Sequence, residues 1–178
     1  MLKILINPAK FNILYNLIIK SLLFLSIISL IIGLIFVFFI SPNDYQQGSM
    51  VKIMYIHVPS AWLSLLTFFI MTIYSVISLS FKISFGFIIN RAVAPVGAIF
   101  TLICLVTGSL WGKPIWGTWW VWDARLTSMF ILFIFYLLII FFRYSFSNIE
   151  VGEKITAILI ILGSINLPII KFSVDWWN

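Results

Sequence analysis

Charged residues are scarce in this chain of 178 amino acids: Asp, Glu, Lys and Arg make up 9% of it, whereas 63% of the residues are hydrophobic. Soluble domains carry roughly a quarter charged residues, so this composition excludes an ordinary soluble domain. The apolar residues form long runs, and about 20 such residues are enough to cross the hydrocarbon core of a bilayer. The chain is therefore long enough for several membrane spans and too short for an additional large soluble domain.

Cysteine and histidine occur once each. Cys104 lies inside an apolar run and cannot form an intrachain disulfide, so we interpret it as a buried, inert thiol. The sequence also has no G-x-x-x-x-G-K-[ST] motif, no pair of carboxylates and no nucleophile beside a base. We therefore expect a chain that is not a self-contained enzyme and has no ATPase of its own.

Five apolar segments predict an all-α fold, a polytopic membrane helix bundle. The second should begin near Pro59, a residue suited to a first helical turn, and Pro95 and Gly97 should interrupt the third. The first is too long for a signal-peptide core, so we expect it to be retained. We expect residues 1–178 to form a single integral membrane domain, with spans at 22–40, 59–80, 92–110, 126–142 and 155–170.

Small and hydroxyl-bearing side chains recur along one side of the second span. Such residues let membrane helices approach each other closely. We therefore expect a helix-packing face here rather than a transport path. The stripe consists of Ser60, Ser64, Thr67, Met71, Ser75 and Ser78.

The basic residues indicate an orientation. The N-terminus and the connections 82–91 and 143–154 share one side of the membrane and hold seven Lys and Arg, against four on the other side. The positive-inside rule then places the N-terminus in the cytoplasm or an organelle matrix. Because these residues are scattered singly, we expect no nucleic-acid partner. The codon bias implied by abundant Ile, Phe and Lys suggests a bacterial inner membrane or, as an alternative, a mitochondrial inner membrane.

The most unusual stretch is residues 111–125, which hold five of the eight tryptophans between Trp111 and Trp122. Tryptophan favours the membrane interface, but an interfacial belt does not explain five on one side of the membrane. A helix over residues 115–125 would place Trp116, Trp119, Trp120 and Asp123 on one face. Gly112, Pro114 and Gly117 indicate an irregular start. Such a wall suits a large planar aromatic ligand.

Two polar residues near this segment have open roles. His57 precedes the second span, where a lone histidine is usually an interfacial polar group, although a neutral imidazole is also an axial ligand for haem iron. Arg125 could bind a ligand carboxylate with both of its terminal nitrogens. It could equally extend its charge to the interface or pair with Asp123.

The run Trp111-Gly112-x-x-x-Trp116-Gly117-x-x-Trp120-x-Trp122-Asp123-x-Arg125 resembles the tryptophan-rich WWD signature of the haem-handling proteins of cytochrome c maturation. Within that superfamily the chain is most similar to the CcmC family of haem exporters. The His-Val-Pro-Ser-Ala-Trp run at 57–62, the Leu-Thr-Ser after Arg125 and the order of the spans are also similar. The resemblance covers essentially the whole chain.

The resemblance implies transient binding of haem b at the outer face of the membrane. The haem would be presented to the haem chaperone CcmE, together with the ABC transporter subunits CcmA and CcmB and the small protein CcmD. It implies His57 as an axial ligand of the iron. It further implies a haem-binding surface made of Trp111, Gly112, Trp116, Gly117, Trp119, Trp120, Trp122, Asp123 and Arg125.

The resemblance ends at Asn178. The family's second haem-binding histidine and its sixth span would follow the Trp-Trp-Asn at 176–178, so we expect the chain to be truncated there. A different class of function remains open, that of a membrane scaffold whose aromatic outer surface docks a partner protein. A channel or permease is less favoured because ionisable residues are nearly absent from the spans.

Overall fold

The computed structural model describes the backbone of residues 8–176 and the side chains of residues 15–173 and 175. It is 85% helical, and the described residues contain no strand. The chain divides into two compact units, residues 1–52 and 53–178. The expectation of a single domain stays a prediction.

The first unit is built around helix α2, Pro8–Ile35, which continues into the π-helical turn η1, Phe36–Ile40. The Ser41 hydroxyl then donates to the Val37 carbonyl at 2.7 Å. The Asp44 carboxylate accepts hydrogen bonds from the backbone N–H groups of Gln46 and Gln47. These local bonds are typical of turns, so the predicted end of the first span at residue 40 is confirmed. The 3₁₀ turn η2, Ser49–Ile53, follows.

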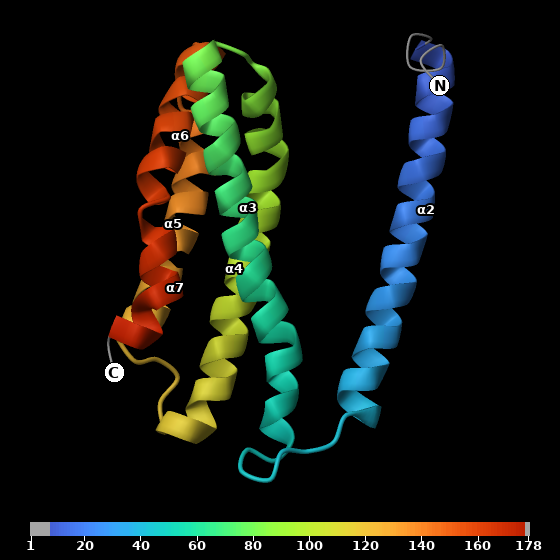
Figure 1. The fold of residues 1–178 in the computed structure, drawn as a ribbon, viewed down its shortest axis with the longest axis vertical. Helices are drawn as coiled ribbons and strands as arrows, with labels where there is room; N and C mark the ends of the chain where they lie inside the picture. Colours follow the sequence, from blue (N-terminus) through green and yellow to red (C-terminus); the bar gives the residue numbers. More distant parts are fainter. Residues whose placement is uncertain (1–7, 177–178) are drawn as a thin grey trace. The chain divides into compact units, whose positions relative to one another are not determined.

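The second unit is a bundle of five helices (Figure 1). Its members are α3, Met54–Phe81; α4, Phe85–Trp116; α5, Ala124–Tyr144; α6, Ile149–Gly163; and α7, Asn166–Trp176. Helices α6 and α7 follow one another along the bundle and together form one apolar stretch, Ile149–Ser173. Counting that stretch once, the described residues contain five helical segments long and apolar enough to cross a membrane. The all-α fold with five spans is confirmed.

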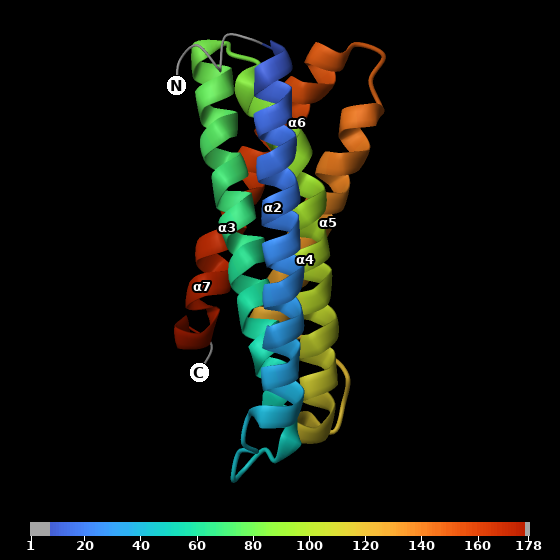
Figure 2. The ribbon, with the colours of Figure 1, turned by 90° about the vertical axis from the view of Figure 1, so that its right-hand side faces the viewer.

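The α3–α4, α4–α5 and α5–α6 connections lie at two opposite ends of this bundle (Figure 2). The α4–α5 loop, which carries three of the five tryptophans of residues 111–125, lies at one end. The α3–α4 and α5–α6 connections lie together at the other. Because α3 starts and α4 ends beside the tryptophan loop, His57 and residues 111–125 come to the same end of the bundle.

The helical segments extend beyond most of the expected span limits, and the prolines and one break lie elsewhere in them than expected. Helix α3 begins at Met54, so Pro59 lies inside it, and α4 runs without a break through Pro95. Proline is tolerated inside membrane helices because neighbouring side chains and small adjustments satisfy the freed carbonyl groups. The fifth span is instead broken after Gly163, where the Ser164 N–H is shared among three carbonyls.

The stripe on the second span packs against α4 and α5. Ser64, Ser75 and Ser78 are at most 1% exposed. The Asn90 amide of α4 donates to Ser75 Oγ at 2.8 Å. The Tyr136 hydroxyl of α5 donates to the Ser64 carbonyl at 2.7 Å and is also 2.7 Å from Thr67 Oγ1. The predicted helix-packing face is confirmed.

Candidate functional site

A pocket of about 220 Å³ lies at the end of the bundle that carries the α4–α5 loop. Pockets that enclose small-molecule ligands typically measure about 300–1,000 Å³, so this one suits part of a larger ligand better than the whole of it. Four helices contribute to its wall. The lining residues are His57 and Ala61 of α3; Cys104, Leu105, Gly108, Trp111 and Trp116 of α4; Arg125, Leu126 and Met129 of α5; and Ile170 of α7.

His57 lies in the first turn of α3 and contacts α4. Its Nδ1 is 3.1 Å from the Cys104 carbonyl oxygen and 3.1 Å from Thr107 Oγ1. Gly108 lies beside the ring, and a Cβ added there would be 3.1 Å from His57 Cε1. The histidine is therefore half-buried and held against one face of α4 rather than extended into the interface.

Cys104 is buried and free. Its burial agrees with the sequence-based expectation. Its position was not expected, because Sγ lies 3.8 Å from His57 Nδ1 and the residue lines the same pocket. The thiol is thus part of the wall beside the imidazole.

The tryptophan segment is helical at its beginning and irregular afterwards. Helix α4 continues through Pro114 to Trp116 and ends at Gly117, whose φ of 73° is in the left-handed region that glycine adopts readily. The Gly117 N–H donates to the Lys113 carbonyl at 3.0 Å, a common way to close a helix. Residues 117–123 are not helical. The expected helix over 115–125, with an irregular start, was wrong: the irregular part follows the helix end.

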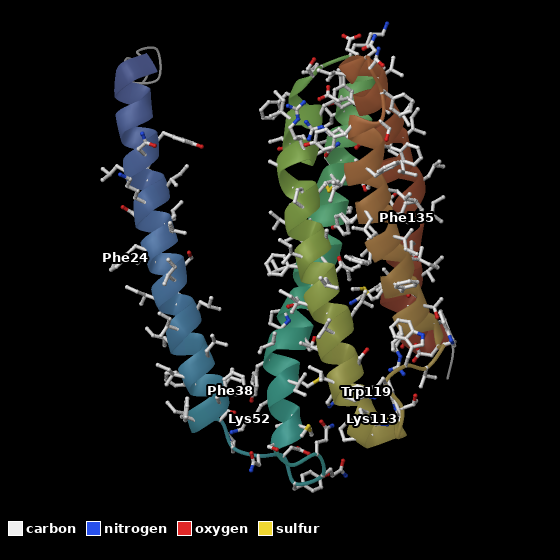
Figure 3. The ribbon with its side chains drawn as sticks, turned by 180° about the vertical axis from the view of Figure 1, so that it is seen from behind. Phe24, Phe38, Lys52, Lys113, Trp119 and Phe135 are labelled. Carbon is white, nitrogen blue, oxygen red and sulfur yellow. The ribbon has the colours of Figure 1, made fainter. Side chains whose placement is uncertain are left out.

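Lys113 secures the start of this loop. Its Nζ donates to the Gly117 carbonyl at 2.9 Å and lies 5.5 Å from the centroid of the Trp119 ring. Figure 3 shows the Lys113 and Trp119 side chains next to each other at the end of α4. A cation at a helix C-terminus is favourable, and its contact with an indole face adds a second attraction.

The helix end distributes the tryptophans over two surfaces. Trp111 and Trp116 line the His57 pocket, with their rings edge to face at 6.4 Å. Trp119 and Trp120 line a separate, open groove between α4 and α5. Trp122 contacts Trp120 edge to face at 5.5 Å and is 75% exposed. One continuous wall of Trp116, Trp119, Trp120 and Asp123 does not form.

Asp123 begins helix α5 and pairs with Arg125. Its Oδ1 accepts a hydrogen bond from the Leu126 N–H at 2.7 Å, which makes it the N-cap. Its Oδ2 accepts from Arg125 Nε at 3.3 Å and from a terminal nitrogen of Arg125 at 3.1 Å. Of the roles left open for Arg125, pairing with Asp123 is therefore the observed one. Arg125 nevertheless borders the pocket and remains half-exposed.

Replacing the cap residue should separate its two roles. Asp123→Ala is expected to lower the free energy of unfolding by about 1 kcal/mol, the usual cost of losing an N-cap. Asp123→Asn keeps a capping oxygen and loses only the partly exposed ion pair, so it should lower the free energy of unfolding by less than Asp123→Ala does. Unfolding by SDS titration of the protein in detergent measures both. Equal losses in the two variants would show that the charge, not the cap, matters.

The structure brings together four of the ten site residues expected from the sequence: His57, Trp111, Trp116 and Arg125. Gly112 supports them, because a Cβ there would be 2.7 Å from the Trp116 ring. Sequence reasoning missed Thr107 and Gly108. Their spacing from Cys104 and Trp111 places all four residues on one face of α4, a signal that was available.

Trp177 and Asn178 lie outside the described residues. Within residues that the structure describes, no three His, Cys, Asp or Glu side chains form a group that could hold a metal ion.

Fold and site together define a multi-span helical membrane protein with a single histidine in an aromatic pocket at one end of its helices. The family model described as heme exporter protein C, CcmC, matches residues 1–178. The chain belongs to the CcmC family.

Individual proteins to which the chain is similar carry names of the same family. The chain is 47% identical over 172 residues to a heme exporter protein C of Bradyrhizobium diazoefficiens, covering 97% of this chain and 65% of the relative. It is 44% identical over 153 residues to a heme exporter protein C of Escherichia coli K12, covering 86% of this chain and 62% of the relative. It is 50% identical over 139 residues to a "ccmC-like mitochondrial protein" of Marchantia polymorpha, covering 78% and 58%. The chain thus spans less than two-thirds of the length of these relatives.

Proposed function

We propose that this chain binds haem b transiently in the His57 pocket, at the outer face of the membrane, as part of haem export for cytochrome c maturation. The observation that carries the proposal is that His57, Trp111, Trp116 and Arg125 line one pocket. An imidazole can ligate iron, indole rings can pack on a porphyrin, and a guanidinium can pair with propionates. The names of the relatives support haem as the cargo.

The size of the pocket suits one edge of a porphyrin. A pocket of about 220 Å³ that is open to the outside leaves part of the ring uncovered, which fits a ligand that is held briefly and passed on. Arg125 would exchange its Asp123 partner for a propionate, or hold both. Gly112 and Gly117 would act indirectly, by admitting the Trp116 ring and by ending α4. Trp119, Trp120 and Trp122, which do not line this pocket, would contact partners instead.

The proposal extends to partners and location. We propose that haem is delivered to the haem chaperone CcmE and that CcmA, CcmB and CcmD complete the complex. ATP hydrolysis would belong to a partner, since the sequence has no phosphate-binding motif and the chain would act as a transport component, not an enzyme. The N-terminus would be cytoplasmic in a bacterial inner membrane, supported by the excess of basic residues on that side. The mitochondrial relative supports a mitochondrial inner membrane as the alternative.

Comparing tryptophans inside and outside the pocket tests this proposal. Haem is titrated into the detergent-solubilised protein and into Trp116→Leu and Trp122→Leu, and the Soret band is recorded. We expect Trp116→Leu to weaken binding about five- to tenfold, because it removes an aromatic contact worth about 1–1.4 kcal/mol. Trp122→Leu is the matched control and should bind as the parent does.

Two results would contradict the proposal. Equal weakening in both variants would mean that haem associates with exposed aromatic surface rather than with the pocket. No saturable haem binding in the parent, under conditions where a known haem protein loads fully, would instead favour a scaffold that docks a partner protein through its exposed tryptophans.

A further inference from the structure

We infer that Thr107 is a positioning residue for His57: together with the Cys104 carbonyl it keeps the imidazole proton on Nδ1, so that Nε2 is the nitrogen offered to the pocket. The inference deepens the proposed function and, in its iron-binding part, rests on it. The observations behind it are three distances from His57 Nδ1 to atoms of α4 and the missing side chain of Gly108.

The direction of each hydrogen bond follows from counting protons. The Thr107 hydroxyl is 2.6 Å from the Ile103 carbonyl and 3.2 Å from the Cys104 carbonyl. A hydroxyl has one proton, and the shorter contact takes it. Thr107 Oγ1 can then only accept from His57 Nδ1, and the Cys104 carbonyl can also only accept. Both partners therefore require a proton on Nδ1.

This proton assignment determines which nitrogen can bind a metal. A neutral imidazole carries one proton, so Nε2 keeps its lone pair. Within the described residues, no hydrogen bond to Nε2 competes for that lone pair. The histidine is thus held in the form that an axial ligand needs before any ligand arrives.

Gly108 completes the arrangement by allowing the ring to lie close to α4. A Cβ at this position would be 3.1 Å from His57 Cε1, a separation tighter than about nine in ten Cβ contacts. Even alanine would force the ring away by a few tenths of an ångström. The two hydrogen bonds to Nδ1 would then lengthen together, because both acceptors belong to α4.

For bound iron, these bonds change how strongly His57 donates electrons. In a histidine that binds a metal, an acceptor for the N–H of the other ring nitrogen raises the basicity of the ligating nitrogen. Removing such an acceptor typically lowers metal affinity about 10–100-fold. Hydrogen bonding around an axial ligand also tunes the reduction potential of haem iron. Thr107 supplies one of two acceptors, so the lower end of that range, about tenfold, is expected on its loss.

The test uses the fact that His57 is the only histidine. Protein labelled with ¹⁵N-histidine, carrying an affinity tag without histidine, gives imidazole nitrogen signals from this residue alone. At pH 8, above the ordinary pKa of an imidazole, long-range ¹H–¹⁵N correlation spectra of the haem-free protein report which nitrogen is protonated. Haem affinity and the midpoint potential of the bound haem are then measured on the same variants.

Thr107→Val keeps the shape of the side chain and removes its oxygen. We expect the haem-free variant to gain a population protonated at Nε2, its haem dissociation constant to rise about tenfold and its midpoint potential to become more positive. Thr107→Ser keeps the hydroxyl, so its proton position, haem dissociation constant and midpoint potential should match those of the parent. Thr101→Val is the matched control, since Thr101 makes the same kind of bond to the Gly97 carbonyl on α4 at 2.7 Å without contacting His57.

The outcomes separate this inference from the proposed function. A parent protein protonated at Nε2, or a Thr107→Val variant with unchanged spectra and haem affinity, overturns the positioning role even if haem binds through His57. Equal effects in Thr107→Val and Thr101→Val overturn it as well, because they would indicate a general loss of helix packing. If the parent is protonated at Nδ1 and Thr107→Val alone shifts the proton, the positioning role stands whether or not haem binds.

Discussion

Substituting His57 by glycine should remove detectable haem binding, and millimolar imidazole should restore it. The loss should exceed the about 10–100-fold caused by losing a hydrogen-bonding partner of a metal ligand, because here the ligand itself is removed. Glycine leaves a space beside Gly108 and the Cys104 carbonyl into which free imidazole can bind. The readouts are the Soret band and the haem dissociation constant of the protein in detergent.

Rescue by imidazole distinguishes a lost ligand from a damaged fold. The parent protein with and without imidazole is the first control, since free imidazole alone should change little while His57 occupies the site. N-methylimidazole is the second: it can ligate iron but cannot donate to the Cys104 carbonyl, so it should rescue less well. If His57→Gly binds haem with unchanged affinity and spectrum, haem binding by this histidine is disproved.

The second large effect concerns the fold. Gly97→Ala is expected to lower the free energy of unfolding by about 2–5 kcal/mol. The Tyr136 ring occupies the place where a Cβ on residue 97 would lie, and Tyr136 itself is fully buried. A methyl group there must separate α4 from α5 or move the ring. Moving the ring also breaks the hydrogen bond that its hydroxyl donates to the Ser64 carbonyl and the hydrogen bond between this hydroxyl and Thr67 Oγ1.

A double-mutant cycle makes this prediction specific. Tyr136→Leu alone should be destabilising, because it removes the buried hydroxyl and part of the ring. In the Gly97→Ala background, Tyr136→Leu should lower the free energy of unfolding clearly less than it does alone, because the smaller side chain leaves room for the added methyl group. SDS titration of the single and double variants gives the free energies. Strict additivity would show that the two side chains do not compete for the same space.

The sequence was sufficient to predict the membrane helices and their packing. Runs of apolar residues predict spans whatever their neighbours are, and the serine stripe of α3 predicts a contact face because small side chains have few other uses in lipid. The boundaries were less predictable. Pro59 and Pro95 reduce local helix stability, but in a membrane bundle neighbouring groups satisfy the freed carbonyls, so both residues lie inside helices.

The candidate site was predicted as a set of residues better than as an arrangement. Gly117 was correctly noted as a residue that disturbs a helix, but whether it begins or ends one depends on its left-handed φ, which the sequence does not determine. Because the helix ends at this φ angle of Gly117, Trp116 lines the His57 pocket and Trp119 lines the groove between α4 and α5. The contact of His57 with the Cys104 carbonyl spans 47 residues along the chain and follows only from the packing of α3 on α4.

The α4–α5 loop is held at both ends before any ligand is present. Lys113 holds its start through the Gly117 carbonyl and the Trp119 ring, and the Asp123 cap holds its end. Ordering a flexible side chain on binding costs about 0.5–1.5 kcal/mol of free energy. The side chains at the two ends of this loop are already ordered in the folded protein, so binding does not have to order them. A ligand that leaves the pocket therefore does not gain loop entropy by leaving. Its residence time should depend on the contacts it makes rather than on opening of the loop.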